Sequence, residues 1–585
     1  MAATSAHPAR LFTSLGGYRR SWLRGDVVAG LTVWAVLVPE SLAYATIAGV
    51  SPVVGLYAAV PALLLYAVFG SSRQLVVATM SGTAALSASV VADAATPGTE
   101  AFVVTTAALA VVVGLLGIVA GLCRMGFLAS FISEPVLKGF IVGLALTIII
   151  GQVPALLGID KPAGDFFEKL WGILAELSSV DGLTVLVGGS ALVAILLLKR
   201  LLPLVPASLV AVLAGIAAVA IFGLDDHGVA VVGSIEAGLP AVGLPDLGLR
   251  DYLDLVGPAA GVLLIGFAEG LGAAKTYAVR EGYEIDANAE LIGMGTANVG
   301  SGLASGMIVN GSLSKTAVNG AAGAKSQVSG ITVALLTLVT LLFLTGLFEQ
   351  LPEAVLAAVV IAAVIELVDI ASLRRLYGVW TGPLGRIYHV TARVDFIAAV
   401  TTMVGVLVFD TLPGLFIGIA VSLLTLLYRS SRPHVARLAR DPGPPPTWVD
   451  LARRPELAAD EELVVVRVEA GLYFANADVV RDAITGMVGP RTRTVVLDAE
   501  TVPTIDVSGA SMLATLRTDL ERRGVALLIA KSIGQVRDVV SAAESVDVIA
   551  GRYPSVDAAV AAARTAETAQ QHEDPPEPGE RKERG

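Results

Sequence analysis

The chain has 585 residues, of which 55% are hydrophobic and only 16% are charged, a composition too apolar for a soluble protein of this length. The net charge of −11 says little about partners, because many acidic residues lie in the tail after Ala566. The single cysteine, Cys123, excludes an intramolecular disulfide. Walker A, C-x-x-C and H-E-x-x-H motifs are absent from the sequence. We therefore expect no enzymatic activity, no cofactor, no metal and no nucleic-acid partner.

Apolar runs of about 20 residues, the length that crosses a bilayer, recur from residue 26 to residue 430. Basic stretches flank them: "YRRSWLRGD" precedes the first run and "YRSSRPHVARLAR" follows the last. Positive charge marks the cytoplasmic side of membrane proteins. This pattern predicts a transmembrane domain over 26–430 with an even number of spans. Residues 1–25 form a cytoplasmic N-terminal segment, and we expect no cleavable signal peptide.

Polar residues interrupt four of the runs. The first run carries Glu40 near its middle, and a later run, "GPAAGVLLIGFAEGLGAAK", carries Glu269. "MSGT" at 80–83 breaks one run, and "IVNGSLSKTAVN" at 308–319 is the most polar of all. Ionisable residues at membrane depth are costly and mark functional sites.

The four interruptions are related by one spacing along the chain. Glu40 and Glu269 are 269 − 40 = 229 residues apart, and the same offset places "MSGT" at 80–83 on "VNGS" at 309–312. This match predicts two similar halves, each with an acidic span followed by a broken one. Inverted repeats with discontinuous helices at corresponding positions indicate the binding site of a secondary transporter.

The broken spans have the chemistry of an anion site. Backbone that is not helical at membrane depth must line a polar cavity, and Gly82 and Gly311 are the predicted turning points. The helix after each turn directs free N–H groups and the positive end of its dipole into the cavity. Lys315 adds a full positive charge, unless it extends to the membrane interface instead. Further hydroxyl donors are Thr83, Ser312 and Ser314.

Glu40 and Glu269 point to coupling with a cation. Burial favours the protonated form of a carboxyl group, so either residue can bind a proton together with the anion. Glu269 can instead ligate Na⁺ together with backbone carbonyls. The alternative for both is a structural hydrogen bond between helices.

The C-terminal part is a separate domain. Strand-like and amphipathic helical segments alternate over 461–565 and predict a small α/β domain. The proline-rich stretch "RDPGPPPTWVD" lies in a predicted linker over 431–460. The polar residues 566–585 are expected to be disordered.

Residues 266–319, with "GFAEGLGAAKTYAVREGYEIDANAELIGMGTANVGSGLASGMIVNGSLSKTAVN", resemble the SulP-type anion permeases, whose vertebrate relatives include prestin and pendrin. The likeness continues at 38–59, 69–79 and 131–148. It implies a polytopic α-helical membrane protein with fourteen spans in a 7+7 inverted repeat, about 26–222 and 252–430. It also implies core and gate domains, an elevator movement, a homodimer, and a plasma-membrane location with both termini cytoplasmic.

The resemblance also assigns site residues. In the family the third and tenth spans face each other at the anion, and Glu269 matches the acidic residue of the eighth span. The matching substrate-binding positions here are Ala78, Thr79, Ser81, Gly82, Thr83, Asn310, Gly311, Ser312, Leu313, Ser314 and Lys315. Two departures stand out: Glu40 replaces the usual Gln, and Ala78-Thr79 replaces Gly-Pro. The second leaves the geometry of the first half-helix open.

The C-terminal domain resembles the STAS domain of the same family. "IDVSGASML" matches the loop that carries the phosphorylated serine in bacterial anti-sigma-factor antagonists, and the matching residue is Ser508. The alternative is that Ser508, with Asp506, caps the helix beginning near Gly509. We expect the domain to support dimer assembly, regulation or docking of a cytoplasmic partner.

The expected function is secondary active transport of an inorganic oxyanion, namely proton-coupled sulfate uptake. Bicarbonate and C4-dicarboxylates remain alternative substrates, coupled to H⁺ or Na⁺. A different alternative is an anion-sensing scaffold that signals through the STAS domain. Lys315 and the STAS domain argue against a nucleobase permease of similar architecture.

Overall fold

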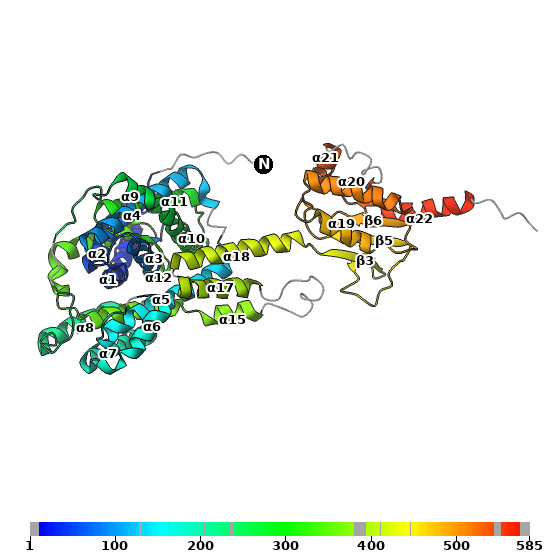
Figure 1. Cartoon of the computed structure of the whole chain (residues 1–585). Helices are drawn as coiled ribbons and strands as arrows, with labels where there is room; N and C mark the ends of the chain where they lie inside the picture. The colour runs from blue at the N-terminus through cyan, green and yellow to red at the C-terminus, as the bar shows by residue number, and fades with distance from the viewer. Residues whose placement is uncertain are drawn as a thin grey trace, which may run out of the picture. The chain divides into compact units, whose positions relative to one another are not determined.

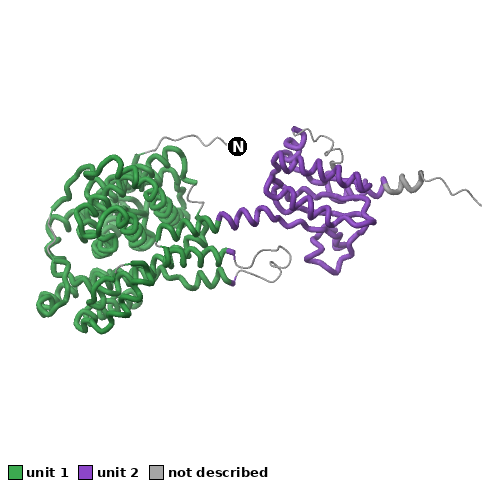
Figure 2. The backbone as a smooth tube through the Cα atoms, in the orientation of Figure 1, with its two compact units in different colours: residues 1–377, 395–422 green, residues 378–394, 423–585 purple. Residues whose placement is uncertain are grey.

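The computed structural model forms two compact units, which Figure 2 distinguishes by colour. The first, here the membrane unit, comprises residues 1–377 and 395–422, and the second, here the C-terminal unit, comprises 378–394 and 423–585. The structure describes residues 11–127, 132–162, 164–202, 205–233, 238–378, 394–409, 411–444, 446–542 and 552–573.

Helices dominate the first half of the membrane unit (Figure 1). Its elements are α1 (Leu23–Ile47), α2 (Pro52–Phe69), β1 (Val76–Ala78), α3 (Ser81–Ala92), α4 (Glu100–Leu122), α5 (Glu134–Leu157), α6 (Phe166–Ala175), α7 (Gly182–Leu201) and α8 (Ala207–Phe222). The second half has α9 (Leu249–Asp254), α10 (Val256–Glu281), α11 (Ala287–Leu303), β2 (Asn310–Ser312), α12 (Leu313–Ala321), α13 (Val328–Val339), α14 (Glu353–Val364), α15 (Ile370–Gly378), α17 (Val394–Phe409) and α18 (Thr411–Ser431).

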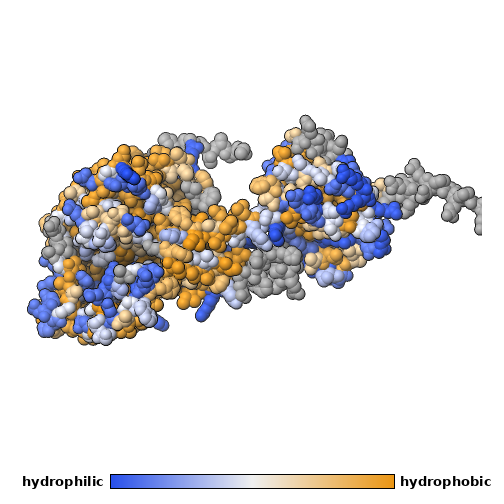
Figure 3. Space-filling model, viewed as in Figure 1, coloured by the Kyte–Doolittle hydropathy of each residue, from blue (hydrophilic) through white to orange (hydrophobic). Residues whose placement is uncertain are grey.

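The helices have the length and composition of membrane spans. Among the described residues, nine helices are long and apolar enough to cross a bilayer, and three apolar helices are shorter: α3, α8 and α17. With α11 and α12, which are polar or short, these numbers fit fourteen spans. Large hydrophobic side chains such as Leu186, Phe343 and Leu424 are more than half exposed. Figure 3 shows hydrophobic residues over much of the visible face of this unit, as expected for contact with lipid.

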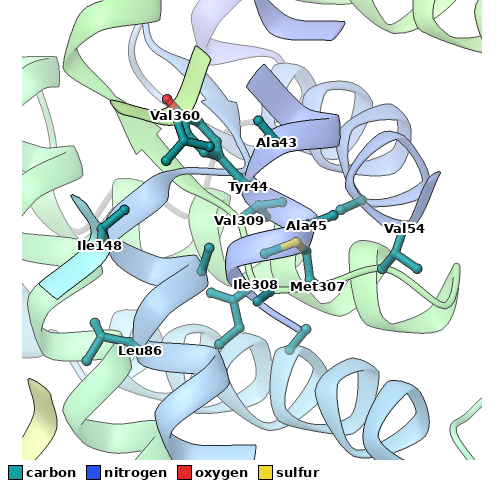
Figure 4. Packing of buried hydrophobic residues seen from close by; sticks show 14 of the residues in the cluster. Ala43, Tyr44, Ala45, Val54, Leu86, Ile148, Met307, Ile308, Val309 and Val360 are labelled. Atoms are coloured by element: carbon teal, nitrogen blue, oxygen red, sulfur yellow. The ribbon is translucent and has the colours of Figure 1, made fainter. Parts of the chain in front are cut away.

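The core of the membrane unit surrounds the two short strands. Helix α11 packs against α2 and α4, and α1 packs against α2 and α13. The close-up in Figure 4 shows Tyr44 of α1 near Val309, in the segment that leads into β2. Residues far apart in the sequence therefore enclose the centre of the unit.

The C-terminal unit is an α/β domain around one six-stranded sheet. Its strands lie in the order β4-β3-β5-β6-β7-β8, and β5 to β8 are parallel. Alternate residues of β5 enter separate cores, since Val464 and Val466 face one cluster and Val465 the other. The elements are β3 (Val435–Asp441), β4 (Thr447–Asp450), β5 (Leu463–Val468), α19 (Ala477–Gly486), β6 (Thr494–Asp498), α20 (Val507–Glu521), β7 (Ala526–Ala530), α21 (Gly534–Ala542), β8 (Arg552–Tyr553) and α22 (Val556–Glu573).

Two predicted boundaries differ from the structure. The expected linker over 431–460 contains β3 and β4, which pair with each other, and β3 also pairs with β5. The proline-rich stretch thus separates the strands of a hairpin instead of two domains. Helix α22 continues to Glu573, so the first residues of the expected disordered tail are helical. Residues 574–585 lie outside the described part of the chain.

Candidate functional site

The two predicted broken spans meet at a pair of short strands. Strand β1 pairs antiparallel with β2, with Val77 opposite Gly311 and Ala78 opposite Asn310. Helix α12 begins directly after β2, and α3 begins three residues after Ala78. Because the strands run antiparallel, α3 and α12 start at opposite ends of this strand pair. The structure places Ala78 beside Asn310 and brings Lys315 Nζ to Thr79 O, so parts of the two predicted segments, 78–83 and 310–315, contact each other.

Helix α12 has a conventional polar start. Its N-cap is Ser312, whose Oγ accepts a hydrogen bond from the Lys315 backbone N at 3.3 Å. The same Oγ shares a hydrogen bond of 3.2 Å with Ser314, which is exposed. Thr316 Oγ1 donates to Ser312 O at 2.5 Å and accepts from Val76 N at 3.0 Å. The start of α12 is thus tied to β1, with the Ser314 hydroxyl accessible.

Helix α3 starts differently from the prediction. Its N-cap is Met80, which has extended backbone angles, and no side chain among the described residues caps it. Gly82 and Thr83 lie inside the first helical turn, so Gly82 is not the turning point. Thr79 and Met80 connect β1 to α3, and Thr79 Oγ1 donates to Ser41 Oγ of α1 at 2.9 Å. The first N–H groups of α3 therefore lack a side-chain acceptor, which makes them available to an anion.

The predicted repeat offset of 229 residues does not align the two halves structurally. The strands start 310 − 76 = 234 residues apart, and the helices after them start 313 − 81 = 232 apart. Glycine and small hydroxyl residues are frequent in the chain, so short gapless matches occur at neighbouring offsets. The two halves are nevertheless paired at the site that the offset singled out.

Close backbone contact holds β2 against α10. A Cβ atom on Gly311 would lie 2.9 Å from the Cα of Gly270, a distance that real Cβ atoms do not tolerate. The amide of Asn310 lies against Gly266 and Gly270 and is only 2% exposed. Its Nδ2 has no hydrogen-bond partner within the described residues. Only glycine at position 311 permits this approach.

Lys315 is paired, not free. Its side chain is 1% exposed, its Nζ lies 2.7 Å from Glu40 Oε2, and it donates to Thr79 O at 3.2 Å. The ammonium group also lies 4.8 Å from the centre of the Tyr44 ring, a cation–π distance. These contacts exclude the alternative in which Lys315 extends to the interface, and they place a carboxylate beside its charge, a pairing that the sequence did not reveal. Glu40 is accordingly part of the same cluster.

Glu269 has a different environment from Glu40. A Cβ atom on Gly82 would lie 4.0 Å from Glu269 Oε2, so this carboxylate faces the first turn of α3. The side chain is partly exposed, and within the described chain no hydrogen bond or ion pair engages it. Leu313 is 50% exposed, whereas Ser81 is 8% exposed. The site therefore contains one paired and one unpaired carboxylate.

Comparison with known proteins identifies the family. Residues 23–382 match the sulfate permease family, and residues 454–559 match the STAS domain. The chain belongs to the sulfate permease family. A probable sulfate transporter of Mycobacterium tuberculosis is 36% identical over 535 residues, which is 91% of this chain and 93% of that protein. High affinity sulfate transporter 1 of Stylosanthes hamata is 30% identical over 542 residues, 87% and 78% of the two chains.

A solved structure has the same fold as this chain. The murine Solute Carrier 26 family member A9 anion transporter, solved in the inward-facing state, matches with a TM-score of 0.85. The match covers 97% of this chain and 96% of that one at 23% identity. Membership of the family makes the protein a multi-pass membrane anion transporter and not an enzyme.

Two further carboxylates, Glu290 and Asp26, are buried in the membrane unit and were not among the predicted site residues. Glu290 is fully buried on α11, where it accepts hydrogen bonds from α2 and the segment before β1. Asp26 is fully buried and accepts from the backbone N of Lys325 at 2.6 Å and from Ser326 Oγ at 2.6 Å. A carboxylate within an apolar run was the available signal for Glu290. Asp26 lacked it, because it stands in a basic flank.

Ser508 lies at the start of α20 in the STAS domain but does not cap it. The N-cap is Asp506, whose Oδ1 accepts from Gly509 N at 2.8 Å and whose Oδ2 accepts from Phe474 N at 2.9 Å. Ser508 is exposed in the first turn. Of the two residues in the capping alternative, the structure therefore assigns the role to Asp506 alone.

Proposed function

We propose that this member of the family takes up sulfate together with protons, and that it binds the anion between the N-termini of α3 and α12. The observation that carries the proposal is the antiparallel pairing of β1 with β2, beside the buried Lys315. The names of its relatives as sulfate transporters support the substrate. Sulfate offers acceptor oxygens on every side, which suits donors from two opposed helix starts.

The free N–H groups of α3 supply one side of the proposed site. The other side has the Ser314 hydroxyl and the start of α12. Backbone N–H groups and helix dipoles bind an anion without the desolvation cost of additional charged residues. The ammonium group of Lys315 supplies the positive charge of the site once its ion pair with Glu40 is broken.

Protonation of Glu40 is the proposed coupling step. The carboxylate of Glu40 balances the charge of Lys315 at 2.7 Å. When Glu40 takes up a proton, the ammonium group of Lys315 is left without its counter-ion and attracts the substrate anion. Proton and anion therefore bind together and leave together. Glu269, unpaired beside the first turn of α3, is the second proposed proton acceptor.

The remaining proposals concern the transport cycle and location. We propose an elevator movement in which the helices around β1 and β2 carry the anion as one body, in a homodimer. Tight packing of α11 on α2 and α4 supports a rigid moving part. The basic flanks of the first and last spans support cytoplasmic termini and a plasma-membrane location.

The test uses purified protein in liposomes with radiolabelled sulfate and an imposed pH gradient, Na⁺ gradient or neither. We expect uptake that is driven by an inward proton gradient and is unaffected by Na⁺. Excess unlabelled bicarbonate, a C4-dicarboxylate and a nucleobase are then added in turn as competitors. A competitor that abolishes the uptake of radiolabelled sulfate is a better substrate than sulfate. Sulfate uptake that ignores both gradients refutes proton coupling. Binding without any flux refutes transport and favours the sensing alternative.

A matched pair of variants tests the site itself. Lys315→Ala removes the buried cation, whereas Lys325→Ala removes a partly exposed lysine that pairs with Glu281 at 2.7 Å. We expect Lys315→Ala to lose sulfate uptake and Lys325→Ala to retain it. Equal uptake by both variants removes Lys315 from the site.

A further inference from the structure

Helix α11 contacts the segments that precede both strands of the site. These segments are here called the first lead (residues 71–75, before β1) and the second lead (residues 307–309, before β2). Its residues Glu290, Asn298 and Ser301 lie on one helical face, at spacings of eight and three residues. All three side chains are at least 97% buried. Glu290 contacts the segment that enters β1, while Asn298 and Ser301 contact the segment that enters β2. One helix thus touches both halves of the inverted repeat just before they meet.

Glu290 accepts four hydrogen bonds, three from the segment before β1 and one from α2. Its Oε1 accepts from Ser71 N at 2.8 Å, Ser71 Oγ at 2.6 Å and Ser72 N at 2.9 Å. Its Oε2 accepts from Tyr66 Oη of α2 at 2.7 Å. A buried carboxylate with this many donors is fixed in position, because every alternative position leaves donors unpaired. The entry to β1 is therefore fixed relative to α11.

The side-chain amide of Asn298 pairs with the backbone of the second lead as the backbone of a neighbouring strand would. Its Oδ1 accepts from Val309 N at 3.0 Å and its Nδ2 donates to Val309 O at 2.9 Å, so one amide satisfies both backbone groups. Nδ2 also donates to Met294 O within the helix at 2.9 Å. Ser301 Oγ donates to Met307 O at 2.5 Å. Val309 immediately precedes β2, whose entry is therefore also fixed relative to α11.

Glycine contacts leave α11 no room to shift. A Cβ atom on Gly293 would lie 2.7 Å from the Cα of Gly70, and one on Gly302 would lie 2.5 Å from Ala107 O of α4. Figure 1 shows α11 beside α4 in the membrane unit. Backbone-to-backbone packing of this kind transmits a displacement directly instead of absorbing it in side-chain rotation.

We propose that Glu290 and Asn298 are positioning residues, which set the distance between the starts of α3 and α12 by tying both leads to α11. Neither residue touches the anion in this proposal. This proposal rests on the proposed function in one respect, namely that the starts of α3 and α12 bind the anion. The distance between α3 and α12 is a property of the protein itself and can be measured whether or not the protein transports sulfate.

The experiment measures that distance and the sulfate affinity in the same variants. Cys123 is replaced by Ser, and spin labels are attached at Ala92→Cys and Ala321→Cys, exposed positions at the ends of α3 and α12. Asn298→Ala leaves both backbone groups of Val309 unpaired. The control is Thr106→Val on α4, a fully buried residue whose hydroxyl, among the described residues, bonds to its own helix at Phe102 O.

We expect Asn298→Ala to broaden the distance distribution and to weaken sulfate binding at least tenfold, while Thr106→Val changes neither. Glu290→Ala should act in the same direction, and Glu290→Gln should largely restore both readouts because Tyr66 Oη can reverse its hydrogen bond. If Asn298→Ala fails to fold, Ser301→Ala, which loses one hydrogen bond, gives a smaller change of the same kind.

Three results would overturn the proposal: an unchanged distance distribution with weakened binding, a broadened distribution with unchanged binding, or an equal response of the Thr106→Val control. Absence of sulfate binding in the unmodified protein contradicts the proposed function instead. In that case the distance measurement still decides whether Glu290 and Asn298 position the two helices.

Discussion

Lys315 Nζ and Glu40 Oε2 lie 2.7 Å apart in a pair that is almost fully buried, with side chains 1% and 9% exposed. The two residues belong to opposite halves of the repeat, Glu40 to the middle of α1 and Lys315 to the first turn of α12. Burying two charges is costly, and their mutual attraction offsets that cost only while both partners are present. The pair therefore links the charge state of the site to its stability.

Glu40→Gln tests the coupling role of this pair. The neutral amide cannot balance Lys315, so we expect sulfate affinity at neutral pH to rise by about tenfold, equivalent to ~1.4 kcal/mol. The same variant should lose the pH dependence of sulfate binding, measured by radioligand binding across a pH series. An unchanged pH dependence would show that the coupling proton binds elsewhere.

Lys315→Ala tests the structural side of the pair. Glu40 then remains as a buried carboxylate without a counter-ion, and the free energy of unfolding should fall by about 3–5 kcal/mol. Combining Glu40→Gln with Lys315→Met should recover most of this stability, because no unpaired charge remains, but not sulfate binding. Denaturation in detergent and sulfate binding on the same samples separate the two effects. Recovered binding in the double variant would contradict a role for the Lys315 charge.

Glu269→Gln addresses the unpaired carboxylate on α10. We expect sulfate flux to continue but to respond weakly to an imposed pH gradient, because the residue beside the first turn of α3 can no longer exchange a proton. The matched control is Glu281→Gln on the same helix, whose carboxylate pairs with Lys325. The measurement is the ratio of sulfate uptake into liposomes with the pH gradient to uptake without it. A gradient response equal to that of the control would leave Glu269 with no part in coupling.

Gly311→Ala tests the close approach of β2 to α10. The added methyl group would meet the Cα of Gly270 at 2.9 Å, so β2 must move and the start of α12 with it. We expect at least a tenfold loss of sulfate affinity, about 1.4 kcal/mol. Gly272→Ala on α10 is the control, because in the described part of the chain its added Cβ would meet no atom within 4 Å apart from the adjacent stretch of its own helix. Equal affinities in the two variants would mean that β2 tolerates displacement.

In the STAS domain, Asp506→Ala and Ser508→Ala should differ. Asp506 caps α20 and also accepts from Phe474 N, so its removal should cost about 1–2 kcal/mol locally. Ser508 is exposed, and its removal should cost almost nothing. Hydrogen exchange of α20 in the full-length protein measures both variants. Faster exchange in Ser508→Ala than in Asp506→Ala would reverse the assignment of the cap.

Much of the membrane fold could be predicted from local patterns. Runs of apolar residues identify spans wherever lipid is the solvent. The polar interruption at 308–319 contains β2, whereas the interruption at 80–83 lies at the start of α3, just after β1. The gapless offset was less reliable, because the connections in the two halves differ by a few residues. The sequence did not reveal the hairpin of β3 and β4, because a proline-rich turn between two strands has the same composition as a linker between domains.

The sequence by itself determined that lipid surrounds the membrane unit, the class of protein and the positions of the two broken segments, because hydropathy and motifs are properties of neighbouring residues. Only the tertiary structure decided that Lys315 pairs with Glu40 and that Glu269 stays unpaired. It also decided that Glu290 and Asn298 hold the two strand leads. These outcomes depend on which helices pack together across hundreds of residues, and in a low-dielectric interior such packing determines the partner of every buried charge.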